Sequence, residues 1–111
     1  MKVFDRMFEG CKNFNCDLSN WSLDNAVSCI QMFSGCKSLT STPKLPVTDL
    51  KPRCYFEMFQ NCESLTEAPE LPAQVLSEAC YFRMFNRCKS FLTAPKLPAT
   101  TLDSNCYTAM F

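Results

Sequence analysis

The dipeptide Met-Phe returns at an almost constant interval along the 111-residue chain, and this repeat constrains the fold more than any other feature. It begins at Met7, Met32, Met58, Met84 and Met110, which gives steps of 25, 26, 26 and 26 residues. A cysteine lies four residues after each of the first four methionines, and Pro-x-Leu-Pro recurs at the same period. A period of about 20–29 residues is typical of solenoids, in which each unit buries its apolar face against its neighbours.

Each repeat contains a segment that predicts a short helix. Between Cys54 and Cys62 five apolar residues fall at positions i, i+1, i+4, i+5 and i+8, so a helix would place these five on one face: Cys54, Tyr55, Met58, Phe59 and Cys62. Gly10, Gly35 and Asn61 each precede a cysteine at the end of such a segment, as expected for a left-handed residue that closes a helix. Arg87, at the same place in the fourth repeat, departs from this pattern.

The segment after each predicted helix reads as a short parallel strand that ends at the second proline of Pro-x-Leu-Pro. Alternation along a strand points every second side chain toward the core. Proline removes a donor from the ladder, so we expect these strands to be very short. The residues expected to face inward are Phe14, Cys16, Leu18, then Leu39, Pro43, Leu45, then Leu65, Pro69, Leu71, and finally Phe91, Pro95, Leu97, with Leu50, Leu76 and Leu102 on the return segments.

These repeats resemble a known family. The pattern MFxGCKSLTxxPxLPxxxLxxxCYxxMF, from Met32 to Phe59 and repeated further along the chain, resembles the BspA-type leucine-rich repeat surface proteins. The first repeat, MFEGCKNFNCDLSNW, is similar to a sister pattern found in surface-lipoprotein repeats. The resemblance implies a right-handed solenoid that serves in adhesion at the cell surface and binds host or matrix proteins.

We therefore predict an α/β fold, namely a right-handed leucine-rich-repeat solenoid of about four units of 25–26 residues. Each unit is expected to contain a short parallel strand and a short helix. Residues 1–111 would form a single leucine-rich-repeat domain, and we expect it to be a fragment of a longer array because neither end shows a polar cap. The unpaired ends predict end-to-end self-association through exposed Tyr107, Met110 and Phe111.

Composition disfavours several classes of function. Eleven basic residues balance eleven acidic ones, so the chain lacks the positive field that nucleic acid would attract. No apolar run is long enough to insert in a membrane, and the N-terminal residues do not form a signal peptide, so a cell-surface or extracellular location follows from the resemblance alone. The chain has no histidine, the commonest general base and metal ligand. We expect no enzyme activity, no cofactor and no metal site.

Nine cysteines raise the alternatives of disulfides, a metal site and buried thiols. Cys54 and Cys62 would lie about 12 Å apart along a helix, which is too far for a shared disulfide or metal. Their repetition favours two columns in which cysteine acts as a small apolar residue, with disulfides between adjacent repeats as the alternative. The expected columns are Cys11, Cys36, Cys62 and Cys88, and Cys29, Cys54, Cys80 and Cys106.

The outward side of the predicted strands is the first candidate binding face. Its candidate residues are Asp17, Ser19, Thr42, Lys44, Glu70 and Lys96. Charges alternate in sign at one position of successive repeats in Lys44, Glu70 and Lys96, and again in Lys37, Glu63 and Lys89 and in Glu57 and Arg83. Such columns either fix the register of neighbouring repeats or offer a polar face to a partner protein.

A second candidate is an apolar stripe on the convex side. Ile30, Phe56 and Phe82 occupy one position of the repeat and fall outside the predicted buried arc. They would bind a partner or pack against neighbouring return segments. The carboxylate pairs Glu67/Glu70 and Asp17/Asp24 lack the accompanying groups of a catalytic site.

The sequence therefore predicts a noncatalytic protein-binding module of a surface or adhesin-like protein. Its expected partner is another protein, such as a host or matrix protein. The alternative is a structural spacer or a self-assembling repeat array that has no ligand of its own. Alternating charges that only set register would favour this second interpretation.

Overall fold

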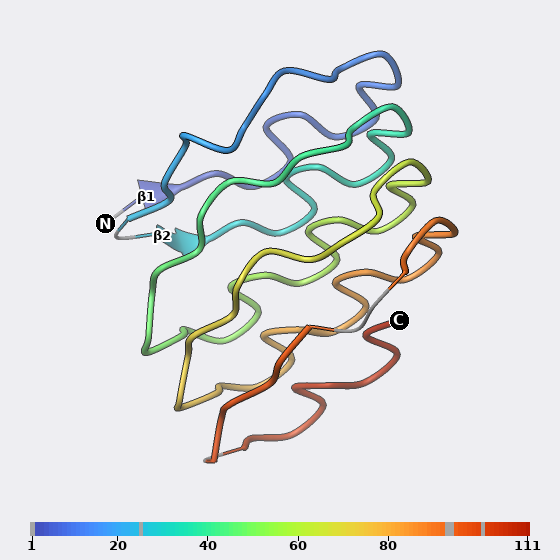
Figure 1. Cartoon of the computed structure of the whole chain (residues 1–111). Coiled ribbons are helices and arrows are strands. Elements are labelled where there is room, and N and C mark those ends of the chain that lie inside the picture. The colour runs from blue at the N-terminus through green and yellow to red at the C-terminus, as the bar shows by residue number, and fades with distance from the viewer. Residues whose placement is uncertain (1, 25, 93–94, 101) are drawn as a thin grey trace.

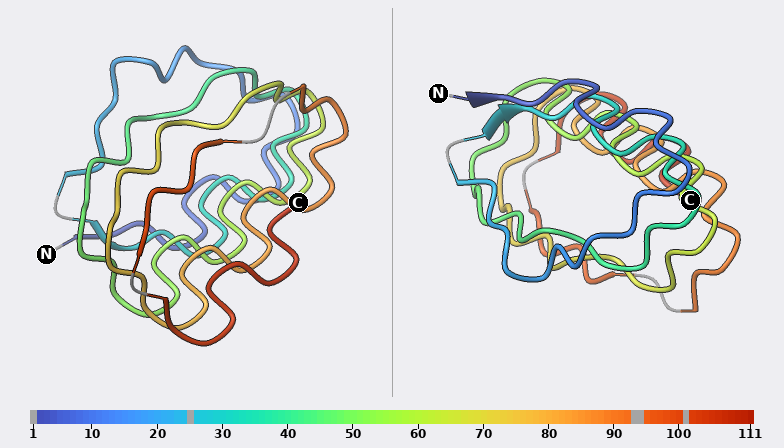
Figure 2. Two further views of the ribbon diagram at one scale, coloured as in Figure 1. Left: turned by 60° about the horizontal axis from the view of Figure 1, so that its bottom comes forward. Right: turned by 90° about the horizontal axis from the view of Figure 1, so that it is seen from above.

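The protein is described by a computed structural model that covers residues 2–24, 26–92, 95–100 and 102–111. The chain winds in successive coils that lie one beside the next, with the two termini at opposite ends of the stack (Figure 1). Viewed from above, the coils overlie one another around a common interior (Figure 2). The molecule measures 36 × 29 × 20 Å. Within the described ranges, no helix is long and apolar enough to cross a membrane.

The stack is held together by backbone hydrogen bonds between the segments that contain Met-Phe. The N–H groups of Tyr55, Glu57 and Phe59 donate to carbonyls 25 residues further along the chain, at 3.0, 2.9 and 2.9 Å. The intervening N–H groups close turns within their own coil, as Met58 N does to the Tyr55 carbonyl at 3.1 Å. Successive N–H groups thus alternate between hydrogen bonds to the next coil and hydrogen bonds within their own coil, and this pattern repeats in each coil.

Left-handed residues make these consecutive turns possible. In the third coil Arg53, Glu57 and Asn61 have φ values of 59°, 52° and 62°, so a positive φ recurs at every fourth residue. Each occupies the third position of a turn, where a positive φ is required in type II geometry. The left-handed residues predicted before the cysteines are confirmed, and Arg87, with a φ of 62°, adopts the same conformation without being glycine or asparagine.

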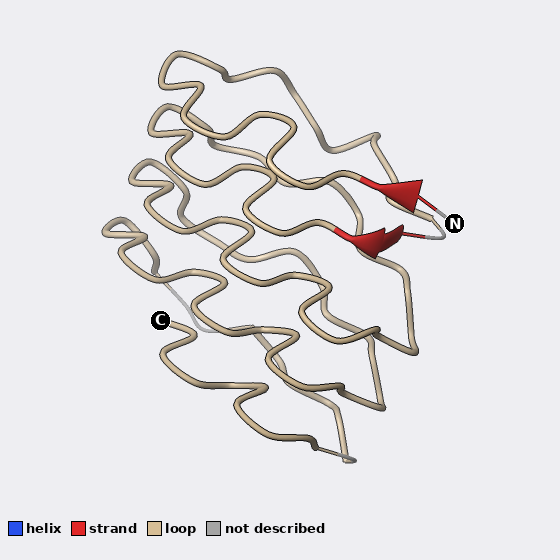
Figure 3. Ribbon diagram, turned by 180° about the vertical axis from the view of Figure 1, so that it is seen from behind, coloured by secondary structure: helices blue, strands red, loops and turns tan. Residues whose placement is uncertain are grey.

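The predicted α/β leucine-rich-repeat solenoid of strand-plus-helix units is wrong. The described part of the chain has no helix and only two short strands, β1 (Lys2–Val3) and β2 (Ala26–Ser28), which pair in parallel (Figure 3). A helix requires each N–H to donate four residues back, whereas here alternate N–H groups donate to the next coil. Apolar residues four apart fit both a helix and a chain of turns, which explains the error.

The strands predicted after the cysteines are also absent from the described residues. Isolated parallel bridges join Ser22 to Lys44 and Asp49 to Val75. The Pro-x-Leu-Pro segments lack N–H groups at both prolines, so a continuous ladder cannot form there. The chain nevertheless stays extended, because proline restricts its own φ and disfavours the helical region for the residue before it.

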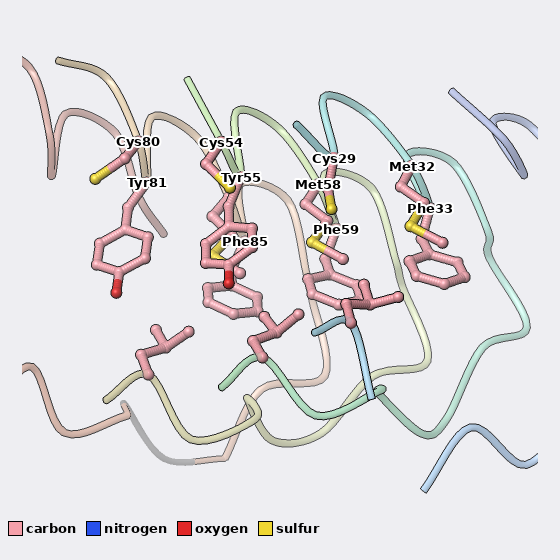
Figure 4. Close-up of a cluster of buried hydrophobic side chains, with 14 of the residues drawn as sticks. Cys29, Met32, Phe33, Cys54, Tyr55, Met58, Phe59, Cys80, Tyr81 and Phe85 are labelled. Carbon is pink, nitrogen blue, oxygen red and sulfur yellow. The ribbon is translucent and has the colours of Figure 1, made fainter. Parts of the chain in front are cut away.

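The core consists of side chains that stack on their counterparts in adjacent coils (Figure 4). Phenylalanine rings form the longest row, with near-parallel neighbours and centroids 5.5–5.9 Å apart. This row contains Phe8, Phe33, Phe59, Phe85 and Phe111. A second row runs from Tyr55 through Tyr81 to Tyr107, with centroids 6.1 and 5.9 Å apart. The repeat therefore builds its core from like residues placed at coil-to-coil spacing.

Most of the predicted inward residues are buried, including Leu18, Leu39, Leu65 and Leu71. Cys16 is exposed, contrary to the prediction, because strand alternation is not kept in the first coil. In the last coil Phe91 and Pro95 are half-buried, whereas Leu97 and Leu102 are 37% and 56% exposed and so do not face a covered core. Their counterparts Leu45, Leu50, Leu71 and Leu76 are buried between coils on both sides.

The apolar residues near Phe111 differ from the predicted exposed set. Phe111 is 53% exposed at the end of the phenylalanine row, as predicted. Tyr107 is half-buried against Tyr81, and Met110 is only 3% exposed, so the prediction of an exposed Met110 is wrong. Met110 takes the buried methionine position of the repeat, and its carbonyl accepts the Phe85 N–H at 2.8 Å.

Candidate binding groove

The Pro-x-Leu-Pro segments place one charged side chain of each coil at the surface. In the second coil Pro43 and Leu45 are buried while Lys44 and Pro46 are exposed. The two prolines restrict the backbone on either side of the charge, so little conformational freedom remains in the segment. Glu70 in the third coil and Lys96 in the fourth are likewise exposed between two prolines, although the leucine that follows is buried in the third coil (Leu71) and exposed in the fourth (Leu97).

Two adjoining hollows follow this row of charges across the coils. The first has a volume of about 460 Å³, and its lining includes Ser19, Lys44, Pro46, Glu70 and Pro72. The second has a volume of about 400 Å³ and extends the first toward Lys96 and Pro98. Both are lined by Pro69, Glu70 and Pro72, so we describe them together as the proline groove. Five prolines contribute to its walls, and its charged groups are Lys44, Glu70 and Lys96.

The charges of the proline groove are not paired with one another. No ion pair or side-chain hydrogen bond joins Lys44, Glu70 or Lys96 to any residue that the structure describes. Their nearest analogues behave differently: Lys89 Nζ lies 3.1 Å from Glu63 Oε2, and this contact holds the pKa of the Glu63 carboxyl below its usual value. The groove therefore presents charged groups that are free to meet a ligand.

A second charge column, on the turn segments, is also satisfied internally. Glu57 is 9% exposed, and its Oε1 accepts a hydrogen bond from Gln31 Nε2 at 2.7 Å. Its Oε2 lies 3.9 Å from Arg83 Nη1, and Gln31 Oε1 in turn accepts from Arg6 Nε at 2.9 Å. This column joins four coils and fixes their register, which is the structural alternative that the sequence left open.

The predicted strand-face residues divide between the groove and its surroundings. Ser19, Thr42, Lys44 and Glu70 line the first hollow, and Lys96 lines the second, so the structure brings these five together. Asp17 does not line either hollow. Its Oδ1 accepts from the Ser19 N–H at 3.0 Å, and this bond keeps the pKa of the Asp17 carboxyl below its usual value.

The prolines were missed as site residues by sequence reasoning. Pro43 and Pro69 were expected only to face the core, yet both also line the groove. The 26-residue spacing of Pro46, Pro72 and Pro98 was the available signal, because residues at that spacing lie in adjacent coils. Strand alternation predicts one face for each residue, so it does not indicate that a proline facing the core can also line an outer surface.

The predicted convex stripe is half-buried and packs on itself. Ile30, Phe56 and Phe82 lie on the turn segments, away from the Pro-x-Leu-Pro segments that form the groove. The rings of Phe56 and Phe82 stack with centroids 4.9 Å apart, and the Arg83 guanidinium lies 5.1 Å from the centre of the Phe82 ring. These contacts favour a role in packing.

All nine cysteines are free thiols, and most are buried. The thiols of Cys36, Cys62 and Cys88 each donate to a carbonyl of the preceding coil, at 3.2, 3.2 and 3.1 Å. Burial raises the pKa of Cys36 and Cys88 to about 11, which keeps these thiols protonated and weakly nucleophilic at neutral pH. No metal-binding cluster of at least three cysteine or carboxylate side chains occurs within the described ranges.

The register of one predicted cysteine column needs correction. Cys54, Cys80 and Cys106 lie four residues before their methionines, whereas Cys29 lies three residues before Met32. Cys29 N donates to the Cys54 carbonyl at 2.6 Å, as Tyr55 N does to the carbonyl of Cys80 at 3.0 Å. Cys29 therefore takes the backbone position of Tyr55 in the stack, and not that of Cys54. Cys29 and Cys54 are nevertheless both fully buried.

Comparison with known proteins assigns the chain to a family by its N-terminal part. Residues 1–71 match the family described as "Mycoplasma protein of unknown function, DUF285". The chain belongs to this family. The matched part of this DUF285 member includes Lys44 and Glu70 of the groove, whereas Lys96 lies outside it. No curated protein and no solved structure matches the chain.

Proposed function

We propose that this protein is a noncatalytic binding module that recognises another protein through the proline groove. The unpaired row of Lys44, Glu70 and Lys96 carries the proposal, because the acidic residues of the other two columns, Glu57 and Glu63, are paired within the molecule whereas Glu70 is not paired with any described residue. Proline walls give apolar contact and a preorganised backbone, so binding would require little ordering of the groove. The charged row would then supply orientation and selectivity.

A noncatalytic role agrees with the chemistry of the groove lining. Proline is the commonest residue in this lining, which also has one carboxylate between two ammonium groups and no thiol. Such a lining can hold a ligand, but it offers no nucleophile next to a general base. We further propose that the module acts at the cell surface in an adhesin-like protein, with a host or matrix protein as its partner. The resemblance of the repeats to BspA-type surface proteins supports this location.

The binding proposal can be tested with two variants of equal charge pattern. The groove variant combines Lys44→Glu, Glu70→Lys and Lys96→Glu, and the control combines Lys37→Glu, Glu63→Lys and Lys89→Glu. Immobilised protein would be used to capture partners from extracellular-matrix and host-cell extracts, followed by measurement of affinity for each purified partner. We expect the groove variant to lose binding and the control to retain it. Equal binding by both variants would refute recognition through the groove.

Surface exposure requires a separate measurement. Intact cells that produce the protein would be treated with a membrane-impermeant amine label, and the modified lysines would be identified by mass spectrometry. Labelling of Lys44 and Lys96 in intact cells is the expected result, since both side chains are exposed. Labelling that appears only after lysis would place the protein elsewhere and leave groove binding to be judged by the variants.

A second candidate function, assembly into a repeat array, is favoured by exposed groups on the first and last coils. Phe111 is 53% exposed, and Met7 in the first coil is 56% exposed. Tyr107 and Ala109 correspond in the repeat to Tyr81 and Arg83. The N–H groups of Tyr81 and Arg83 donate to carbonyls of the next coil. A second copy could accept these bonds on its first coil and continue the stack. Light scattering over a concentration series would show growing mass if chains stack, and constant monomer mass would exclude it.

A further inference from the structure

The spacing of the charged row limits which ligand can contact it. Lys44, Glu70 and Lys96 lie on consecutive coils, and the stacked rings of Phe33, Phe59 and Phe85 show centroid separations of 5.5 and 5.6 Å between those coils. Hydrogen-bonded chains lie about 4.8 Å apart, so the two coil-to-coil steps between Lys44 and Lys96 place these lysines roughly 10 Å apart. A ligand that meets both lysines therefore needs two anionic groups about 10 Å apart.

The proline walls exclude recognition by addition of a strand. Pro43, Pro46, Pro69 and Pro72 have no N–H groups, so a partner backbone cannot form a continuous ladder with these segments. Ligand contacts must come from side chains and from apolar packing against the proline rings. This requirement favours an extended peptide that carries its own side-chain pattern, because a narrow chain can follow the groove across the coils.

A polyproline II helix matches both the length and the direction of the required groups. It rises about 3.1 Å per residue with three residues per turn, so residues i and i+3 point the same way and lie about 9.3 Å apart. In a β-strand, residues i and i+3 point to opposite faces, so they could not both reach the row. Two carboxylates three residues apart in polyproline II thus fit Lys44 and Lys96.

Glu70 adds selectivity between the two lysines. A carboxylate opposite Glu70 would be repelled, so the residues between the two acids should be neutral. With this arrangement the row rejects adjacent acidic residues and accepts acids separated by two neutral ones. The row carries two positive charges and one negative charge, which further favours an acidic ligand.

We propose that the proline groove binds an acidic polyproline II segment of a partner protein, with carboxylates at positions i and i+3 on Lys44 and Lys96. This inference rests on the proposed binding function and names the chemistry of the partner. Each exposed ion pair contributes only about 0.2–1 kcal/mol, so a single segment binds weakly and repeated segments would bind more tightly through multivalency.

The test uses three labelled octapeptides and fluorescence anisotropy with the full chain. PPEPPEPP has the proposed spacing, PPPEEPPP has the same composition with adjacent acids, and PPKPPKPP reverses the charge. We expect PPEPPEPP to bind most tightly and PPKPPKPP not to bind. Lys44→Gln and Lys96→Gln should each weaken PPEPPEPP about two- to fivefold, and the matched control Lys37→Gln should not. Glu70→Gln should reduce the difference in affinity between PPEPPEPP and PPPEEPPP.

Several results would overturn the inference. It fails if the two acidic peptides bind equally, if Lys37→Gln weakens binding as much as Lys44→Gln, or if no acidic peptide binds. The proposed function is judged separately by capture of partners with the charge-reversed groove. If capture of partners is lost in the groove variant while the peptides do not bind, the ligand class is wrong and the binding function stands. If the groove variant captures partners as well as the wild-type protein and the peptides do not bind, both proposals fail.

Discussion

Replacing Arg87 by glycine should stabilise the protein. Arg87 has a φ of 62°, is exposed, and has no side-chain hydrogen bond or ion pair with a described residue. The left-handed conformation costs a non-glycine residue about 1–2 kcal/mol, whereas glycine adds about 0.5–1 kcal/mol of entropy cost relative to alanine. The net effect is an increase of roughly 0.5–1 kcal/mol in the free energy of unfolding, which corresponds to a few degrees in Tm for a domain of this size.

The neighbouring residue supplies a matched control. Asn86 lies in the same turn segment but does not have a positive φ, so Asn86→Gly should destabilise the protein by about 0.5–1 kcal/mol. Urea unfolding followed by circular dichroism would give both free energies, with equal m-values as the check on two-state behaviour. A helix would make both glycine substitutions destabilising. A loss of stability in Arg87→Gly as large as that in Asn86→Gly would refute the chain of left-handed turns.

Three further predictions concern the buried thiols and the tyrosine row. Cys11 and Cys16 are exposed and should react with a thiol reagent in the native state, whereas the buried cysteines should react only after unfolding. Rapid reaction of any native thiol other than Cys11, Cys16 and half-buried Cys88 would contradict the packing. Burial raises the pKa of Cys36 from 9.0 to about 11. The contribution of the protonated thiol to stability is therefore complete below pH 9 and is lost as the pH rises toward 11. The urea concentration at the unfolding midpoint should fall over this window and stay constant between about pH 7 and 8.5. The Tyr55 hydroxyl is buried without a partner among the described residues, so Tyr55→Phe should raise the free energy of unfolding by about 1 kcal/mol. A clear decrease of this free energy in urea unfolding would contradict an unpartnered hydroxyl.

The repeat could be recognised from sequence because its spacing is fixed by the stack. Residues 25–26 apart lie in adjacent coils, and the rows of Phe33, Phe59 and Phe85 and of Tyr55 and Tyr81 follow directly from that spacing. Burial of Leu45 and Leu71 in Pro-x-Leu-Pro was also predictable, since the prolines keep the segment extended and alternation then decides which side chain faces inward, whereas Leu97 in the fourth coil is 37% exposed.

The local backbone could not be predicted in the same way. The spacing of Cys54, Met58 and Cys62 is four residues, which lies close enough to 3.6 to suggest a helix. Only the positive φ values distinguish the observed turns, and glycine marks that conformation in the first two coils alone. Glu57, Arg83 and Arg87 adopt it without any local sequence signal, because hydrogen bonds to the next coil compensate for the strain.

The candidate site was predictable in its charges but not in its shape. Lys44, Glu70 and Lys96 were identified from their alternating sign, and the same pattern occurs in Lys37, Glu63 and Lys89. Sequence alone could not show which column is paired. That distinction depends on side-chain geometry, which brings Lys89 to within 3.1 Å of Glu63 and leaves the groove residues unpaired among the described ones.

The most direct test of the account is a map of the bound partner on the protein by heteronuclear NMR. Amide signals would be followed during titration with a partner captured by the wild-type protein and lost with the charge-reversed groove, or with PPEPPEPP. We predict that the largest shifts occur among the lining residues of the groove that have an amide proton, namely Ser19, Thr42, Lys44, Leu45, Ala68, Glu70, Leu71 and Lys96. Shifts concentrated on the turn segments around Phe56 and Phe82, with the groove signals unchanged, would contradict recognition through the proline groove.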